Sequence, residues 1–221
     1  MRVLSKCLYV AVCVLPLVLS SAAFAMVIED GQVHVIDYRV QEALSIRCDP
    51  SYHAPSGVML RDPAITAQTI VFDNCSLRVV GGTGGNIYSL NDSSVLIEGG
   101  SFNRLVAFDQ STVEITGGLF RATDCSLYLG AHVNTHVSTV TISGGTFYGV
   151  IDMKNYYGVM TISGGEFHKA VNFEDGARGM ITGGSFSGKE IEISESAHLT
   201  LCGSDFKVDG APVMYGTVYE G

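Results

Sequence analysis

A nine-residue pattern recurs along most of the chain and constrains the fold more than any other feature. One copy reads Thr139-Val-Thr-Ile-Ser-Gly-Gly-Thr-Phe147, an alternating strand-like segment followed by two glycines and a phenylalanine. The last position of each copy falls at Gly84, Phe102, Phe120, Phe147, Phe167, Phe186 and Phe206. The spacings between these positions are 18, 18, 27, 20, 19 and 20 residues. A period of roughly twenty residues indicates a solenoid.

The pattern inside one repeat identifies the kind of solenoid. Val113 and Ile115 alternate with polar neighbours, as in a strand with one buried face. The two glycines then break the strand, because glycine adopts backbone angles that a Cβ resists. A second short strand follows, and we expect its core pairs at Val106/Phe108, Ile151/Met153 and Val171/Phe173. Each repeat thus supplies two or three short strands and no helix.

Coiling such repeats stacks equivalent strands in parallel and in register, about 4.8 Å apart, so the core becomes columns of like residues. One predicted column holds Leu77, Val95, Val113, Val140, Met160, Gly179 and Leu199, and its neighbour holds Val79, Ile97, Ile115, Ile142, Ile162, Ile181 and Leu201. A third holds Phe102, Phe120, Phe147, Phe167, Phe186 and Phe206, and the corners hold Gly99, Gly100, Gly117, Gly118, Gly144, Gly145, Gly164, Gly165, Gly183 and Gly184. The sequence predicts an all-β, parallel β-helix of about seven coils.

The segments outside the repeats complete the expected organisation. Residues 1–25 combine basic residues, an apolar run and a final Ala23-Phe24-Ala25, which is typical of a secretory signal peptide. We therefore expect an exported protein (secreted, periplasmic or at the cell surface) whose mature chain begins at Met26 and contains no membrane span. Residues 26–65 fit an N-terminal cap, 66–206 the repeats with an insertion near 121–137, and 207–221 a C-terminal cap.

The net charge of the chain disfavours some classes of binding partner, and its cysteines allow disulfides. The chain has 13 Lys+Arg and 22 Asp+Glu, and removing Arg2 and Lys6 leaves 11 against 22, a balance of −11. Such a chain repels nucleic acid and anionic membrane surfaces. Export permits disulfides among Cys48, Cys75, Cys125 and Cys202, and the sequence leaves all three pairings open.

The repeat strings themselves resemble a known group. Ile142-Ser-Gly-Gly-Thr-Phe147 and Ile181-Thr-Gly-Gly-Ser-Phe186 are similar to repeats of bacterial exported right-handed parallel β-helix proteins of the pectin-lyase-like fold. Some members of that group serve as adhesins or autotransporter passengers. The resemblance implies right-handed coiling, in line with the handedness of parallel crossovers, and it marks the fold better than the function.

The second strand offers candidate site residues on its outward side. We place Ala107, Asp152, Asn172 and Glu192 there, the last after a one-residue shift in its coil. Asp152 and Glu192 would lie two coils apart, about 10 Å, which suits the carboxylate pair of a glycosidase. A lyase would instead require calcium, with a base drawn from Arg104, Lys169 or Lys189. The Asn-x-Asp, Asp-Asp, His-Gly and Arg-x-Lys signatures of pectin-degrading hydrolases are absent from the sequence.

These features favour a binding protein over an enzyme. The hypothesis is an exported, non-enzymatic β-helix with a surface, adhesive or carbohydrate-binding role, whose partner is a polysaccharide or another surface protein. Its candidate binding residues are Asp152, Asn172, Glu192, Tyr156 and Tyr157, because tyrosines stack on sugar rings. No cofactor or metal is assigned. The alternative is a small polysaccharide lyase or glycosidase that uses Asp152 and Glu192.

Overall fold

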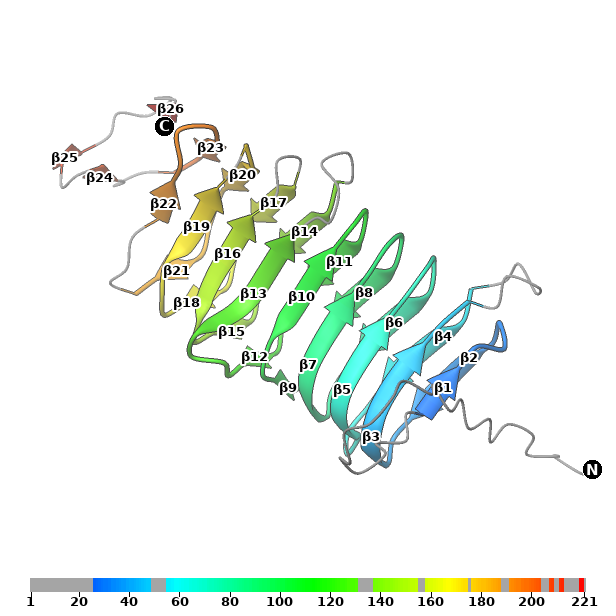
Figure 1. Cartoon of the computed structure of the whole chain (residues 1–221). Coiled ribbons are helices and arrows are strands. Elements are labelled where there is room, and N and C mark those ends of the chain that lie inside the picture. The colour runs from blue at the N-terminus through cyan, green and yellow to red at the C-terminus, as the bar shows by residue number, and fades with distance from the viewer. Residues whose placement is uncertain are drawn as a thin grey trace, which may run out of the picture.

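The computed structural model describes residues 26–48, 55–130, 137–154, 158–174, 176–187, 191–203, 207–208, 211–212 and 219–220. These residues form a right-handed parallel β-helix of about eight turns (Figure 1). The described residues contain no helix, and hence none long and apolar enough to cross a membrane. The predicted fold class is therefore confirmed. The expected signal peptide, Tyr156, Tyr157, Lys189 and Phe206 lie outside the described residues.

One side of the β-helix is a ten-stranded sheet, here sheet B. Its parallel strands are β2 (Val33–Ile36), β4 (Gly57–Leu60), β6 (Ser76–Val79), β8 (Ser94–Ile97), β11 (Thr112–Ile115), β14 (Thr139–Ile142), β17 (Val159–Ile162), β20 (Arg178–Ile181) and β23 (His198–Leu201). The short β26 (Tyr219–Glu220) pairs antiparallel with β23 and occupies the free edge of the last coil. Covering an edge in this way removes a template for unwanted strand pairing.

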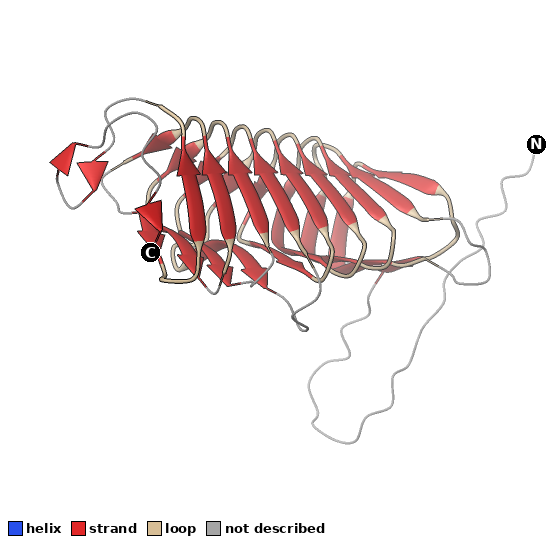
Figure 2. Ribbon diagram, turned by 90° about the horizontal axis from the view of Figure 1, so that it is seen from above, coloured by secondary structure: helices blue, strands red, loops and turns tan. Residues whose placement is uncertain are grey.

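The rest of each coil belongs to a fourteen-stranded sheet, here sheet A. Its long strands are β1 (Met26–Ile28), β3 (Arg39–Ile46), β5 (Ile65–Val71), β7 (Thr83–Ser89), β10 (Leu105–Phe108), β13 (Cys125–Gly130), β16 (Val150–Lys154), β19 (Val171–Glu174) and β22 (Ile191–Ile193). Its two-residue strands are β9 (Ser101–Phe102), β12 (Leu119–Phe120), β15 (Thr146–Phe147), β18 (Glu166–Phe167) and β21 (Ser185–Phe186). A separate two-stranded sheet joins β24 (Lys207–Val208) to β25 (Ala211–Pro212). Figure 2 shows the stacked strands with their turns aligned along one edge.

The glycine pairs form the corner between sheet B and the two-residue strands. At Gly144 a Cβ would lie 2.2 Å from the carbonyl oxygen of Thr116 in the preceding coil, so no larger residue fits. Gly145 has φ +95°, a region that residues with a Cβ rarely adopt. The equivalent glycine pairs from Gly99 to Gly184 are similar. At the first glycine of each pair an added Cβ would lie 2.2–2.5 Å from a backbone carbonyl oxygen of the preceding coil. The motif thus serves close stacking of coil on coil.

The core consists of the expected columns. Val113, Val140 and Met160 are paired in register, as are Ile115, Ile142 and Ile162, and all six are fully buried. The phenylalanine rings stack in parallel, with centroids 4.7 Å apart for Phe120 and Phe147 and 5.2 Å apart for Phe147 and Phe167. A continuous ladder of this kind buries apolar faces that a single repeat leaves exposed.

The N-terminal segment differs from the sequence-based expectation. Residues 26–65 contribute β1 to β4 and the start of β5, and these strands continue both parallel ladders in register. β3, β5 and β7 each run as one long strand through the second corner of the coil, where later coils have two separate strands, and β7 pairs with both β9 and β10. The corner that follows sheet B consists of Asp37-Tyr38 before β3 and of residues 61–64 before β5, so it lacks the two glycines and the repeat pattern fails to mark these coils. Before β7 this corner is Gly81-Gly82, as in the later coils. In addition, β13 occupies part of the expected 121–137 insertion.

A candidate binding face on the outer side of sheet A

The outward residues of the long strands of sheet A form two straight rows along the helix axis. The first outer row holds Ile70, Tyr88, Val106, Tyr128, Asp152, Asn172 and Glu192, each in register with the next. The second outer row holds Phe108, Gly130, Lys154 and Glu174 in register. Phe72 and Leu90, each one residue beyond the end of its strand, continue this row. Both rows change from apolar to charged at the same place, between β13 and β16.

This register corrects two predictions. Ala107 is completely buried, and Val106 takes the outward position beside Tyr128, so the expected core pair Val106/Phe108 is wrong. The inward pair of β10 is Leu105 and Ala107. All four residues of β10 are apolar, so hydrophobic alternation does not show which of them face the core. In addition, Glu192 pairs directly with Asn172 and requires no one-residue shift.

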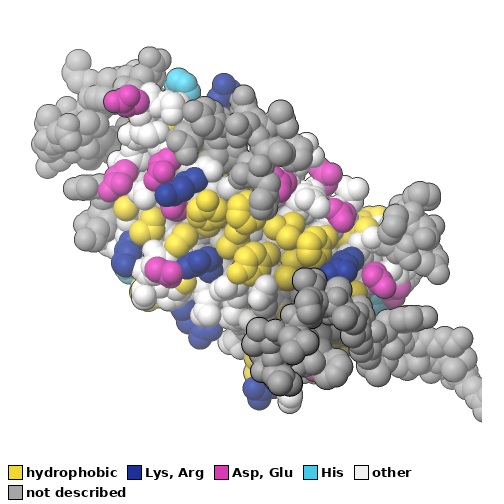
Figure 3. Space-filling model, in the orientation of Figure 1, with side chains coloured by type: hydrophobic (Ala, Val, Ile, Leu, Met, Phe, Trp, Pro, Cys, Tyr) yellow, Lys and Arg dark blue, Asp and Glu magenta, His cyan; other side chains and the backbone are white. Residues whose placement is uncertain are grey.

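The apolar half of the two rows forms a continuous surface, which we call the aromatic face. It consists of Ile70, Phe72, Tyr88, Leu90, Val106, Phe108 and Tyr128. Figure 3 shows hydrophobic side chains gathered in a band across the middle of this side of the molecule. Most of these side chains are half-buried, and Val106 retains 6% exposure. Contiguous apolar surface bordered by charges is typical of an interaction site.

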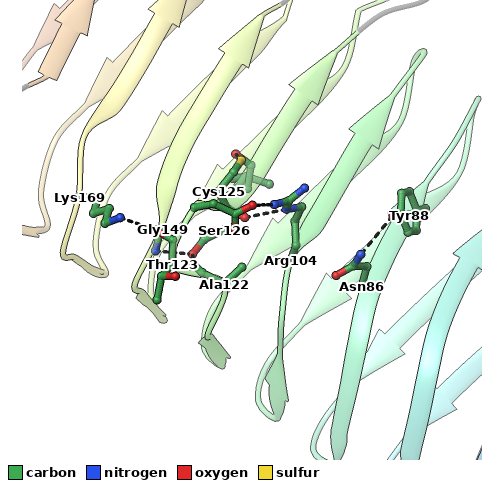
Figure 4. Close-up of polar contacts among 11 residues, drawn as sticks. Asn86, Tyr88, Arg104, Ala122, Thr123, Cys125, Ser126, Gly149 and Lys169 are labelled. Atoms are coloured by element: carbon green, nitrogen blue, oxygen red, sulfur yellow. Dashed lines mark hydrogen bonds and ion pairs between the residues drawn. The ribbon is translucent and has the colours of Figure 1, made fainter.

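Contacts within the aromatic face orient its rings. Phe108 and Tyr128 meet edge to face with centroids 5.7 Å apart. A Cβ at Gly130 would lie 2.4 Å from Phe108 Cε1 and 2.8 Å from Tyr128 Cε1, so the two rings fill the space over this glycine. At the other end the Arg47 guanidinium lies 5.3 Å from the centroid of Phe72. The Asn86 amide donates a hydrogen bond of 3.2 Å to the Tyr88 hydroxyl (Figure 4).

The lengthened corner before β13 borders the aromatic face. Ser126 lies in a bulge, donates to the Ala122 carbonyl at 3.1 Å and accepts from the Gly149 amide at 2.7 Å. Arg104 donates to the Cys125 carbonyl at 2.8 Å and pairs with Asp124. Lys169 donates to the Thr123 carbonyl (Figure 4). Arg104 and Lys169, two of the three residues considered as the base of a lyase, thus donate hydrogen bonds to backbone carbonyls at this corner.

The charged half of the rows, Asp152, Asn172, Glu174 and Glu192 with Lys154, is here called the acidic end. The Lys154 Nζ lies 3.6 Å from Asp152 Oδ2 and 3.5 Å from Glu174 Oε2. Burial raises the pKa of the Asp152 carboxyl, whose side chain is 19% exposed; Lys154 opposes the rise and Glu174 adds to it. The oxygens Asp152 Oδ1 and Asn172 Oδ1 are buried without a hydrogen-bond partner among the described residues. Within the same residues no three His, Cys, Asp or Glu side chains are grouped to hold a metal ion.

A second polar cluster lies on the corner of the later coils. His168 Nδ1 is 3.3 Å from the Ser187 hydroxyl, and His168 Nε2 is 3.3 Å from Glu166 Oε1. The Ser187 hydroxyl also lies 3.2 Å from the Phe167 carbonyl, which can only accept, so its proton is directed to the backbone. Tyr148 stacks on His168 with centroids 4.6 Å apart. These contacts give the cluster a structural role at the corner.

Of the four cysteines in the described residues, two form a disulfide and two are free thiols. Cys48 and Cys75 form a disulfide between the end of β3 and the start of β6. Cys125 and Cys202 are free. Burial raises the pKa of the Cys125 thiol, which keeps it in its unreactive protonated form.

The fold and this face define a parallel β-solenoid protein with an amphipathic outer sheet. No protein-family model, curated protein or solved structure matches the chain significantly. Among the expected site residues, Asp152, Asn172 and Glu192 lie side by side in the first outer row. Tyr88 and Tyr128 of the same row and Phe108 of the second outer row were not expected on this face. A period-two pattern in Ile87-Tyr88-Ser89 and Leu127-Tyr128-Leu129 carried the signal for two of them.

Proposed function

We propose that the protein is an exported, non-enzymatic binding module that holds a polysaccharide chain along the aromatic face. The observation that carries the proposal is the placement of Tyr88 and Tyr128 in one outward row, separated by one strand. Two strand spacings set the tyrosines about 10 Å apart. Tyrosine presents both an apolar ring and a polar hydroxyl, a combination that suits a sugar ring with C–H faces and hydroxyl edges.

The shape of the surface favours an extended polymer. Both rows run parallel to the helix axis, so a chain lying along the axis meets a new strand roughly every 4.8 Å. It would pass from the tyrosines to the amide and carboxylates of Asn172, Asp152 and Glu192, which offer hydrogen bonds to hydroxyl groups. A flat, repeated surface of this kind binds a repeating ligand at several places at once.

Two features favour export. Residues 1–25 have the sequence pattern of a secretory signal peptide. The Cys48–Cys75 disulfide is compatible with an oxidising compartment.

The experiment that tests the proposal is binding of the mature protein to an array of polysaccharides, scored for both retention and chain shortening. Tyr88→Ala and Tyr128→Ala should each weaken retention of the bound polymer about tenfold, roughly 1.4 kcal/mol. Tyr148→Ala is the matched control, because this tyrosine is 43% exposed but lies on the corner beside His168. Equal losses in all three variants, or no retention of any polymer, would remove the basis for the proposal.

The alternative function, a lyase or glycosidase, has one specific observation in its favour. The raised pKa of Asp152 is the direction that a general acid requires. Glu192 lies two strands away in the same row and would be the second carboxylate. Shortening of a polymer by the parent protein, lost in Asp152→Asn, would replace binding with catalysis as the function.

A further inference from the structure

We infer that the polysaccharide bound on the aromatic face carries free amino groups, and that the acidic end binds their ammonium form. This inference rests on the proposed function and specifies its ligand. It follows from the charges and the accessible carboxylates that continue the tyrosine row.

The acidic end has an excess of negative charge. Asp152, Glu174 and Glu192 carry three carboxylates, and the single cation among them is Lys154, so their balance is −2. The Lys154 ammonium is shared between Asp152 and Glu174, at 3.6 and 3.5 Å. Glu192, the next charge along the row, is exposed.

The acceptors at this place also exceed the donors. Asp152 Oδ1 and Asn172 Oδ1 are buried, so the acceptors that a ligand can reach are the exposed Glu192 carboxylate and the Glu174 carboxylate, whose side chain is 37% exposed. An ammonium group is the complement of such a site, because it has three donors and no acceptor. A neutral hydroxyl would supply one donor and bring acceptors of its own.

An anionic polymer finds no comparable partner here. Among the described residues, three cations near the aromatic face already have partners: Arg104 with Asp124 and the Cys125 carbonyl, Lys169 with the Thr123 carbonyl, and Arg47 with Phe72 and the Ser45 hydroxyl. The mature chain, with 11 Lys+Arg against 22 Asp+Glu, carries −11 overall. Its field therefore attracts cationic chains and repels uronate chains.

The position of the acidic end favours an amino sugar polymer over a basic peptide. Tyr128 and Asp152 are adjacent in the same row, so one straight ligand meets rings and carboxylates on successive strands. An amino sugar polymer presents a ring face and an ammonium group in each repeating unit. It therefore satisfies both halves of the surface with one repeated chemistry.

The test is calorimetric titration of the mature protein with glucosamine oligosaccharides, with the same oligosaccharides after N-acetylation, and with oligogalacturonate. The free-amine form should bind at least tenfold more tightly than the acetylated form, and oligogalacturonate should bind most weakly. The preference for the free amine should shrink as salt is added, because exposed charges are screened.

Variants separate the inference from the function on which it rests. Asp152→Asn combined with Glu192→Gln should abolish the preference for the free amine while the acetylated form still binds. Tyr128→Ala should weaken both forms alike. Glu114→Gln, which removes an exposed carboxylate from the outer side of sheet B, should change neither.

Three outcomes would overturn the inference. Equal binding of the free-amine and acetylated forms would show that charge does not select the ligand, although the proposed function would stand. A preference that survives the double variant, or one lost equally in Glu114→Gln, would place the effect elsewhere. If neither oligosaccharide binds, while oligolysine binds or the protein self-associates through Tyr128, the proposed function fails as well.

Discussion

Tyr128 of β13 and Asp152 of β16 are paired in register on the outer side of sheet A. One step along the ladder therefore changes the surface from an aromatic ring to a carboxylate. In the second outer row the same step changes Gly130 to Lys154. The border between the aromatic face and the acidic end is thus a straight line between two strands, and any ligand that crosses it encounters both chemistries.

The raised pKa of Asp152 makes its contribution to stability depend on pH. A carboxyl whose pKa is higher in the folded than in the unfolded state binds more protons when folded, so stability falls as pH rises through that window. The window begins near the unperturbed value of ~3.9 and extends upward. Asp152→Asn removes this loss of folding stability at higher pH, because asparagine does not titrate. The melting temperature of the variant relative to the parent should therefore be higher at neutral pH than at acidic pH.

Thermal unfolding of the parent and of Asp152→Asn over this pH range checks the prediction. Glu114→Gln, an exposed carboxylate on β11, serves as the control and should run parallel to the parent. A difference between Asp152→Asn and the parent that stays constant with pH would contradict the assigned direction.

Two glycines, Gly149 before β16 and Gly130 at the end of β13, should respond differently to a methyl group. At Gly149 a Cβ would lie 2.3 Å from the Ala122 carbonyl oxygen and 2.8 Å from the Ser126 amide nitrogen, which are backbone atoms that cannot move aside. At Gly130 it would meet the edges of Phe108 and Tyr128, which can rotate. Gly149→Ala should therefore cost about 2–3 kcal/mol and Gly130→Ala about 1 kcal/mol or less.

Urea unfolding measures both losses. Gly130→Ala should also weaken polysaccharide retention, because the displaced rings belong to the aromatic face. A Gly130→Ala variant less stable than Gly149→Ala would show that the rings are held more firmly than the backbone.

The core columns predict a sharp contrast between neighbouring residues of β14. Ile142 is fully buried between Ile115 and Ile162, so Ile142→Ala should lower the free energy of unfolding by about 2–5 kcal/mol. Ile142→Asp should prevent the middle coils from folding, because it buries an unpaired charge. Thr141→Ala, on the outward side of the same strand, should stay within about 0.5 kcal/mol of the parent. Similar losses at 141 and 142 would refute the register.

The disulfide should stabilise the first coils. Cys48 and Cys75 are 27 residues apart in the chain, and closing a loop of this size in the unfolded state stabilises by about 3.5 kcal/mol in the chain-entropy account. Cys48→Ala combined with Cys75→Ala should therefore unfold at lower urea concentration, and reduction should do the same to the parent. Cys202→Ser, at an exposed thiol, is the control. Titration of the unfolded, unreduced mature protein should find two thiols; four would contradict the bridge.

Sequence reasoning succeeded where the pattern is local and unambiguous. Alternation such as Thr139-Val-Thr-Ile has one reading, since only Val140 and Ile142 are apolar, and the Gly-Gly pair fixes where each coil turns. The columns through Ile142 and Phe147 follow from aligning the copies of the repeat motif. Which residues of β10 face the core could not be predicted, because Leu105, Val106, Ala107 and Phe108 are all apolar. The coils before residue 66 were missed because Asp37-Tyr38 and residues 61–64 form the corners before β3 and β5, in place of the Gly-Gly motif.

The sequence by itself determined that this chain winds into a parallel β-helix, because short-range alternation and the repeat length specify strand, corner and stacking together. It also specified the columns of the core, which follow from aligning the copies of the repeat motif. The tertiary structure alone decided the surface. The first outer row joins positions 88, 106, 128, 152, 172 and 192, whose spacing changes around the lengthened corner, so the alignment of Tyr128 with Asp152 depends on how that corner folds. The pairing of Cys48 with Cys75 was likewise decided by which turns the stacked coils bring together.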